Sequence, residues 1–416
     1  MATNDIIVGI DVGSGTIRAV VGRAQEDEEG VRSLHVIGVG EATSGGMRRG
    51  VIVDIEEAVS AISEALEKAE RTSGMPIERA FVSASGTHIQ SQTSKGVIAV
   101  SRADNEIAED DVQRVVDAAS TVSVPPNQEI LHVVPQSYSV DTQENVKDPV
   151  GMSGIRLEVE ATIISGSSAY VKNLTKCVQR AGVEIEGIVI APMAASMSVL
   201  TKRQKELGVA LVDVGAGTTS LIVFEEGDML HSAILPVGSG HITNDLAIGL
   251  RTSVDVADKV KLKHGSADPK EFKDGQTVDL RKLGGDEDGV VSRKEIAEII
   301  EARLSELFDL VGAELKEINR QGQLPGGIVL VGGGAKLPGL VDVAKDRLKL
   351  PAQIGFPERL PGLNEALDDP SFAVAQGLVL WGYKHLAEPS RGLKGGILSV
   401  SDSVGKIKER FKAFLP

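Results

Sequence analysis

Two short segments of the chain, residues 11–16 and 213–218, share the pattern Asp-Val-Gly-x-Gly-Thr between apolar runs. Glycine lacks a Cβ, so backbone N–H groups at such a turn can approach an anion closely, and threonine adds a hydroxyl donor. This composition predicts a phosphate-binding hairpin. An aspartate beside phosphate needs a cation between them, so we expect Asp11 and Asp213 to face Mg²⁺ or its water shell.

Either hairpin alone is explained equally well by an ordinary strand-to-strand turn. The repetition changes this balance, because two copies far apart in the sequence indicate two similar halves that face one ligand. A third glycine cluster, residues 332–335, follows an apolar run at 328–331 and precedes an expected helix. Its bare backbone is suited to pass under a flat base or a sugar phosphate. Together the three segments predict a nucleotide-binding site.

The composition limits the classes of protein that the chain can represent. Its 416 residues correspond to roughly two or three domains. A net charge of −15 argues against general nucleic-acid binding, because phosphate contacts dominate that affinity. The single cysteine, Cys177, excludes an intrachain disulfide and suits a reducing compartment. The histidines lack the spacing of metal ligands, so we expect no metal other than Mg²⁺.

Neither a signal peptide nor a membrane-spanning segment is expected. Residues 1–5 carry no basic or apolar targeting pattern. The most apolar stretch, 187–200, is short and contains Pro192, so it is unsuited to span a bilayer.

Runs of strand type alternate with stretches of helical periodicity, which predicts α/β lobes with helices packed on sheets. Two blocks interrupt this alternation, and we expect each to be an inserted subdomain. In the first block, Pro135 separates two expected strands, 130–134 and 137–141; in the second, an exposed hairpin is expected within 265–289. The expected division is a first-lobe core at 1–83 and 163–195, its insertion at 84–162, a second-lobe core at 196–227 and 306–386, its insertion at 228–305, a linker at 387–400 and a terminal helix at 401–416.

The terminal segment 401–416 has the pattern of an interfacial membrane helix. Its apolar residues fall within an arc of roughly 100° on a helix, and its basic residues line the flanks and back. The alternative is a helix that docks on the body of the protein itself. The predicted membrane-binding residues are Val404, Lys406, Ile407, Lys408, Arg410, Phe411, Lys412, Phe414 and Leu415.

These features together resemble the actin-like ATPase superfamily, which includes actin and sugar kinases. Within it, the chain resembles the FtsA family of bacterial cell-division proteins over essentially its whole length. The discriminating parts are residues 44–54, residues 148–159 and the basic terminal helix. The resemblance implies an actin-like (ribonuclease H-like) α/β fold with two lobes, duplicated cores, one inserted subdomain in each lobe and ATP in the cleft between them.

The resemblance also implies which residues hold the cofactors, ATP and Mg²⁺. Asp11 and Asp213 match the Mg²⁺-side aspartates, and Asp258 and Lys261 match a helix that meets the ribose and base. Gly238 and Gly240 are expected to line the same cleft. The loops that match the family's phosphate and adenosine motifs comprise Gly13, Ser14, Gly15, Thr16, Gly215, Ala216, Gly217, Thr218, Gly332, Gly333, Gly334 and Ala335.

The family's partners follow from the same resemblance. It implies binding of the C-terminal tail of FtsZ on the second insertion, self-assembly into a filament, attachment to anionic lipid and contacts with other divisome proteins. No nucleic-acid partner is expected, because the chain is acidic. The expected location is peripheral, on the cytoplasmic face of the inner membrane at the division site.

One departure from the superfamily affects the expected chemistry. Many relatives carry a carboxylate or a glutamine that orients the attacking water just after the strand at 185–190. Here residues 190–193 read Ile-Ala-Pro-Met. Without such a group, a general acid–base contribution of ~10²–10⁴ is missing. We therefore expect tight ATP binding, slow hydrolysis and no identifiable catalytic residue.

Two other functions remain open. An actin-like small-molecule kinase needs a catalytic aspartate aimed at a substrate, and the sequence places none. A PilM-like adaptor of type IV pili binds a short peptide of a membrane partner, but such chains lack a basic terminal helix.

Overall fold

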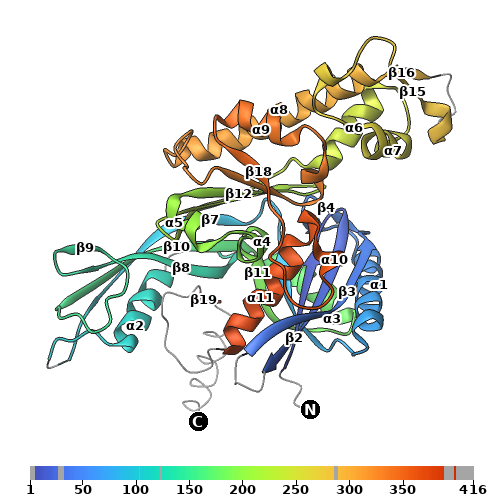
Figure 1. Cartoon of the computed structure of the whole chain (residues 1–416). Coiled ribbons are helices and arrows are strands. Elements are labelled where there is room, and N and C mark those ends of the chain that lie inside the picture. The colour runs from blue at the N-terminus through green and yellow to red at the C-terminus, as the bar shows by residue number, and fades with distance from the viewer. Residues whose placement is uncertain are drawn as a thin grey trace.

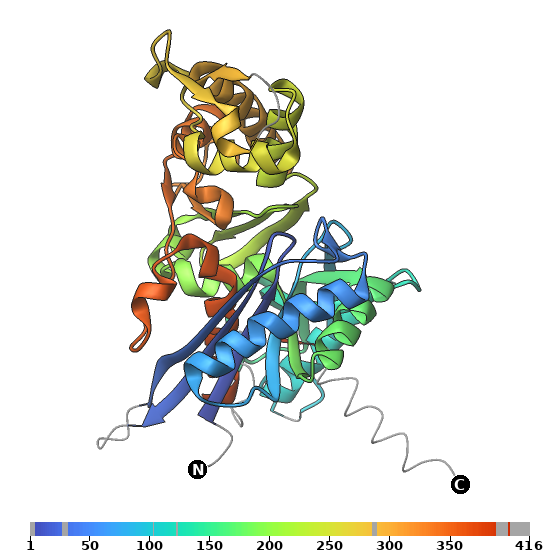
Figure 2. The same ribbon diagram turned by 90° about the vertical axis from the view of Figure 1, so that its right-hand side faces the viewer.

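The computed structural model describes residues 5–26, 32–102, 104–121, 124–284, 289–387 and 398–399. It consists of two α/β lobes, one above the other in Figures 1 and 2, and a smaller sheet that projects to one side of the lower lobe. The predicted α/β class is therefore confirmed. The expected membrane helix, residues 401–416, lies outside the described residues.

The first lobe is built on a sheet with the strand order β11-β6-β1-β2-β3. Strands β1, β2 and β3 pair antiparallel, whereas β6 and β11 join in parallel. Ile7, Val8, Ile10 and Val12 are all buried, as expected for a sheet covered on both faces. The strands are β1 (Ile6–Val12), β2 (Thr16–Glu26), β3 (Arg32–Thr43), β6 (Arg79–Ala84) and β11 (Glu184–Ile190).

Helices α1 (Ile55–Ser73) and α3 (Ser168–Arg180) lie side by side on one face of this sheet (Figure 2). Helix α1 begins where the Asp54 carboxylate accepts a hydrogen bond of 3.0 Å from the N–H of Glu57, and it ends at Gly74 with φ 69°. Its core positions include Ile62 and Leu66, as the helical spacing predicts.

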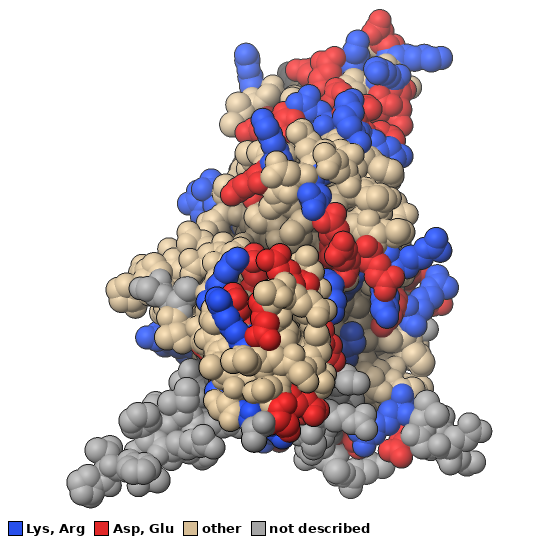
Figure 3. All heavy atoms as spheres, turned by 90° about the vertical axis from the view of Figure 1, so that its left-hand side faces the viewer, with Lys and Arg blue, Asp and Glu red and all other residues tan. Residues whose placement is uncertain are grey.

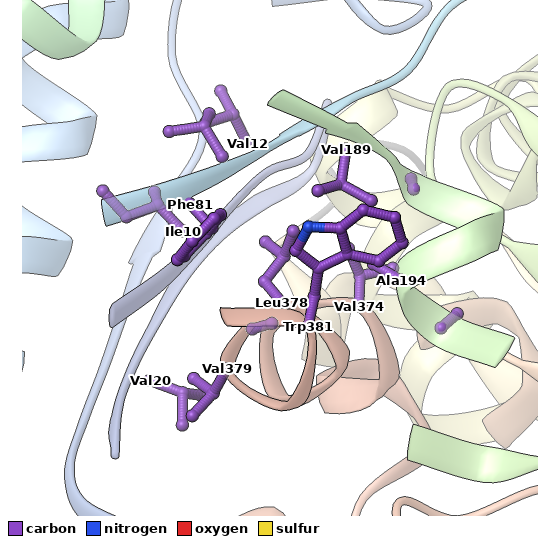
Figure 4. Packing of buried hydrophobic residues seen from close by; sticks show 14 of the residues in the cluster. Ile10, Val12, Val20, Phe81, Val189, Ala194, Val374, Leu378, Val379 and Trp381 are labelled. Carbon is purple, nitrogen blue, oxygen red and sulfur yellow. The ribbon is translucent and has the colours of Figure 1, made fainter. Parts of the chain in front are cut away.

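Helices α4 (Ala191–Val199) and α11 (Ala373–Ala387) cover the other face of the sheet. Figure 4 shows Trp381 and Leu378 of α11 close to Ala194 of α4. Because α4 leads into the second lobe and α11 returns from it, these two helices form the connection between the lobes.

The second lobe repeats the arrangement, with the strand order β14-β13-β12-β17-β18. Strands β12, β13 and β14 pair antiparallel, and β17 and β18 join in parallel. One face of this sheet packs toward α4 and the first-lobe core, and the other packs toward α8 and α9. The elements are α5 (Lys202–Leu207), β12 (Val209–Val214), β13 (Thr219–Glu225), β14 (Asp228–Leu235), α8 (Arg293–Glu317), β17 (Ile328–Val331), α9 (Leu340–Leu348), β18 (Ala352–Ile354) and α10 (Asn364–Leu367).

The projecting sheet belongs to the segment between β6 and α3 and has its own core against α2. Two separate strands were expected on either side of Pro135, and this expectation is wrong. One continuous strand, β8, passes through Pro135, because a register shift falls where Pro135 faces Ala161 and a bulge tolerates the missing N–H. The elements are β7 (Gln90–Ala99), α2 (Glu109–Ser120), β8 (Gln128–Val140), β9 (Gln143–Val146) and β10 (Arg156–Ser167), and β19 (Leu398–Ser399) pairs with β8.

The second insertion consists of helices at the tip of the upper lobe (Figure 1). The hairpin expected within 265–289 is formed by β15 (Thr277–Asp279) and β16 (Val290–Ser292), so its second strand lies just beyond the expected range. The helices are α6 (Ser239–Gly249), α7 (Val254–His264) and the start of α8. Across the part of the chain that the structure describes, no helix is both long and apolar enough to cross a bilayer.

Candidate functional site

The two hairpin loops and the third glycine cluster meet at one cleft between the lobes, with a volume of about 520 Å³. This volume is in the range of small-molecule sites. Loop one (residues 13–16) joins β1 to β2, loop two (215–218) joins β12 to β13, and the 332–334 loop follows β17. The predicted residues that line the cleft are Asp11, Gly13, Ser14, Gly15, Thr16, Asp213, Gly215, Ala216, Gly217, Thr218, Asp258, Lys261, Gly332, Gly333 and Gly334.

The tips of loops one and two touch each other. A Cβ on Gly15 would lie 2.6 Å from the Cβ of Ala216, and one on Gly217 would lie 3.0 Å from the Ser14 hydroxyl. The two glycines are therefore required by the contact between the lobes as well as by the approach of an anion. The Ser14 hydroxyl accepts a hydrogen bond of 2.7 Å from the N–H of Gly50, which leaves its own proton free to donate.

Three predicted residues lie behind the cleft wall. Gly238 and Gly240 are not among the lining residues, which differs from the expectation that both line the cleft. The turn that contains them supports loop two: the N–H groups of Ser239 and Gly240 donate to the carbonyl oxygens of Gly215 and Ala216, each at 2.8 Å. Ser239 itself lines the cleft. Ala335 is fully buried beneath the 332–334 loop.

Asp11 and Asp213 face the cleft from the ends of β1 and β12. Burial raises the pKa of both carboxyl groups, and the neighbouring Asp11 raises the pKa of Asp213 further, to about 7. Ser83 donates a hydrogen bond of 2.8 Å to Asp11, and Arg18 faces Asp11 across the β1–β2 pair. Two half-buried carboxyl groups that disfavour each other's charge are suited to share a cation.

The donor set fits Mg²⁺ held with a nucleotide. Asp11 and Asp213 offer the carboxylate oxygens that Mg²⁺ prefers, and the remaining positions suit waters and phosphate oxygens. When bound, the ion neutralises phosphate charge. Loops one and two supply N–H and hydroxyl donors on either side, and Arg18 adds a cation at the cleft wall.

The raised pKa of Asp213 predicts a pH dependence of stability. The folded protein binds this proton more tightly than the unfolded chain, whose carboxyl has an ordinary pKa of 3.8. The stabilisation is present below that value and is lost as the pH rises through about 7. Between pH 6 and pH 8, urea denaturation of the metal-free protein should show a loss of about 1.4 kcal/mol from this group. The variant Asp213→Asn should lack this loss; equal losses in both proteins would contradict the assignment.

At the side of the cleft that α7 lines, Asp258 and Lys261 form an ion pair of 2.8 Å. Thr243 of α6 joins them: Lys261 donates to its hydroxyl at 2.7 Å, and that hydroxyl donates to Asp258 at 3.1 Å. No pattern in the sequence points to Thr243, because α6 and α7 meet only in the tertiary structure. Leu262, Leu337 and Pro338 add apolar surface beside this polar group, as a base and its ribose require.

Ala191, directly after β11, lines the cleft at the position where the resemblance led us to look for a water-orienting side chain. The acidic lining residues that the structure describes are Asp11, Asp213 and Asp258. None of them comes from this end of β11.

Comparison with known proteins gives two family matches. The model described as cell division protein FtsA matches residues 210–377, and the model described as the SHS2 domain inserted in FTSA matches residues 86–165. The cell division protein FtsA of Pseudomonas aeruginosa is 36% identical over 411 residues, which cover 99% of this chain and 97% of that protein. The corresponding protein of Bacillus subtilis is 39% identical over 379 residues, which cover 91% of this chain and 84% of that protein.

Solved structures show the same fold at low identity. The PilM–PilN type IV pilus biogenesis complex matches with a TM-score of 0.66 and 17% identity, over 90% of this chain and 98% of that chain. MreB5 of Spiroplasma citri bound to AMPPNP matches with a TM-score of 0.54 and 16% identity, over 94% of this chain and 100% of that chain. These similarities confirm the predicted actin-like, two-lobed fold.

Proposed function

Since the chain belongs to the FtsA family of cell-division proteins, we propose that it is an ATP-binding filament subunit that tethers FtsZ to the membrane. The observation that carries the nucleotide part is the convergence of two phosphate-type loops, two half-buried aspartates and a third glycine-rich loop on one cleft. The AMPPNP-bound MreB5, which has the same fold, supports it.

In this proposal Mg²⁺·ATP bridges the two lobes. The loops contact each other at Gly15 and Gly217, so a ligand that holds both loops favours one arrangement of the lobes. Ala191 in place of a water-orienting side chain favours slow hydrolysis, so that bound ATP acts as a clamp on that arrangement.

The remaining parts of the proposal concern the partners. The second insertion, around α6, α7 and the start of α8, takes the C-terminal tail of FtsZ, and residues 401–416 bind anionic lipid. Assembly into a filament joins many weak membrane contacts, and avidity makes the attachment firm. The protein is then peripheral on the cytoplasmic face of the inner membrane at the division site, with other divisome proteins as partners.

A second candidate function, an adaptor that binds a peptide of a membrane protein, follows from the resemblance to PilM-like chains; the PilM–PilN type IV pilus biogenesis complex has the same fold. The basic terminal segment and the family matches support the FtsZ tether over this adaptor. A small-molecule kinase has less support, since the acidic lining residues all have places in nucleotide or Mg²⁺ binding.

Co-sedimentation with liposomes tests the proposal. With Mg²⁺·ATP present, the protein should carry FtsZ into the liposome pellet, and FtsZ without its C-terminal tail should stay in the supernatant. Phosphate release by the protein in the same mixture should stay well below about 1 s⁻¹, the lower end of typical enzyme turnover. Equal pelleting of tailed and tailless FtsZ would exclude the tether, and turnover at or above that rate would exclude the clamp.

A further inference from the structure

Strand β14 has a defined contact at each end. At its C-terminal end, Leu235 leads into the turn at 236–240, whose N–H groups hold the carbonyl oxygens of Gly215 and Ala216 in phosphate loop two. The strand is paired with β13 along its length, and its eight residues span about 26 Å at 3.3 Å per residue. A displacement of loop two therefore moves β14, because this paired strand is stiffer than a loop would be.

From its N-terminal end to its middle, β14 is bonded to the sheet that projects from the first lobe, which we call the inserted sheet (β7, β8, β9 and β10). Ser91 of β7 donates a hydrogen bond of 2.9 Å to the carbonyl oxygen of Ser232, and Gln136 of β8 donates one of 2.9 Å to that of Met229. Lys147, just after β9, forms an ion pair with Asp228. We call these three contacts between β14 and the inserted sheet the clasp.

A cavity of about 420 Å³ lies beside the clasp, and residues 90–92 of β7 and 231–234 of β14 line it. Both are edge strands of their sheets, and they face each other across this space. On the far side of the cavity, His231 of β14 contacts Glu314 of α8 at 2.9 Å. This contact ties β14 to its own lobe, so the strand moves with the second lobe.

Figure 3 shows the face on which the inserted sheet lies foremost, with basic and acidic side chains interspersed.

The connectivity makes the clasp sensitive to motion between the lobes. The inserted sheet leaves and rejoins the first lobe through β6 and α3, yet the clasp bonds it to the second lobe. Any displacement of loop two relative to loop one must either break the clasp or pull the inserted sheet with β14.

We propose that β14 couples the nucleotide cleft to the inserted sheet, so that ligand bound at loop two and the position of the inserted sheet regulate each other through the clasp. This inference rests on the proposed binding of Mg²⁺·ATP. By linkage, the effect is reciprocal. A ligand that holds loop two in place also stabilises the position of the inserted sheet, and loss of the clasp lowers the affinity for that ligand by the same factor.

The test uses the full chain at concentrations where sedimentation velocity shows a monomer, with Mg²⁺·ATP as the probe. In the wild-type protein, ATP should slow amide hydrogen exchange in β7 and β8 by about fivefold, the low end of measured couplings. The double variant Gln136→Ala/Lys147→Ala should lose this slowing and should bind Mg²⁺·ATP about fivefold more weakly in calorimetric titration. The matched control is Lys95→Ala, because the ion pair of Lys95 with Glu160 (3.2 Å) stays inside the inserted sheet; it should behave as wild type.

The readouts separate the two proposals. If the wild-type protein shows no titration heat with Mg²⁺·ATP, the proposed nucleotide function fails, and the coupling falls with it. If ATP binds but exchange in β7 and β8 does not change, the coupling alone is overturned. The coupling is also overturned if Lys95→Ala weakens the binding of ATP as much as the clasp variant does. The loss of affinity would then reflect general damage to the inserted sheet.

Discussion

Replacing Gly333 with valine should weaken Mg²⁺·ATP binding by about 100-fold or more, which corresponds to roughly 2.7 kcal/mol. Gly333 lines the cleft, and no protein atom lies within 4 Å of the position that its Cβ would take. A larger side chain therefore enters open space at the cleft rather than the protein core, where it obstructs the adenosine side of the ligand. Titration calorimetry with Mg²⁺·ATP measures the loss.

The same position offers its own controls. Gly333→Ala adds one carbon and should give a smaller loss, and the thermal midpoint of both variants should match the wild type. Gly334 is unsuited to this test, because its Cβ would lie 2.5 Å from a Val214 methyl group and disturb the fold. Unchanged affinity in Gly333→Val, with the fold intact, would show that ATP does not lie against this loop.

Removing residues 401–416 should abolish co-pelleting with anionic liposomes while Mg²⁺·ATP affinity stays unchanged. Fully burying each large apolar side chain contributes about 1.5–3 kcal/mol, and interfacial burial contributes less. The loss of five such residues should lower the membrane partition of a monomer by roughly 100-fold. Pelleting of the full chain should increase steeply with protein concentration, because a filament binds through many helices at once.

Two substitutions separate the apolar from the electrostatic contribution. Phe411→Asp should reduce pelleting on neutral and anionic liposomes alike, whereas Lys408→Glu should reduce it mainly on anionic ones and less at high salt. Liposome binding that survives the deletion would mean that the membrane contact lies elsewhere in the chain. It would also favour the alternative that the terminal segment docks on the protein body.

The features that the sequence predicted well are local. Glycine, aspartate and threonine at fixed spacing identified both phosphate-type loops, and the cluster at 332–335 identified the third. Helical spacing indicates α1, and α8 begins at Arg293 directly after its capping residue, Ser292. In each case the physical requirement, such as a turn, a helix face or a cap, is satisfied within a few neighbouring residues.

The partners of these residues depend on chain segments far apart in the sequence. Arg18 and Ser83 approach Asp11 because of the β1–β2 register and the β1–β6 pairing. Thr243 joins Asp258 and Lys261 because α6 packs beside α7. The continuation of β8 through Pro135 likewise depends on its long partner β10, whose register shift accommodates the missing N–H.

The sequence by itself thus determined which backbone segments form glycine-rich turns beside an aspartate, because these patterns express short-range sterics and charge. The tertiary structure alone decided that the loop tips touch, that Gly238 and Gly240 support loop two from behind, and that β14 links the cleft to the inserted sheet. These arrangements follow from sheet order and from the packing of α4 and α11 between the lobes. Contacts between segments so far apart in the sequence produce no periodic pattern of residues along the chain.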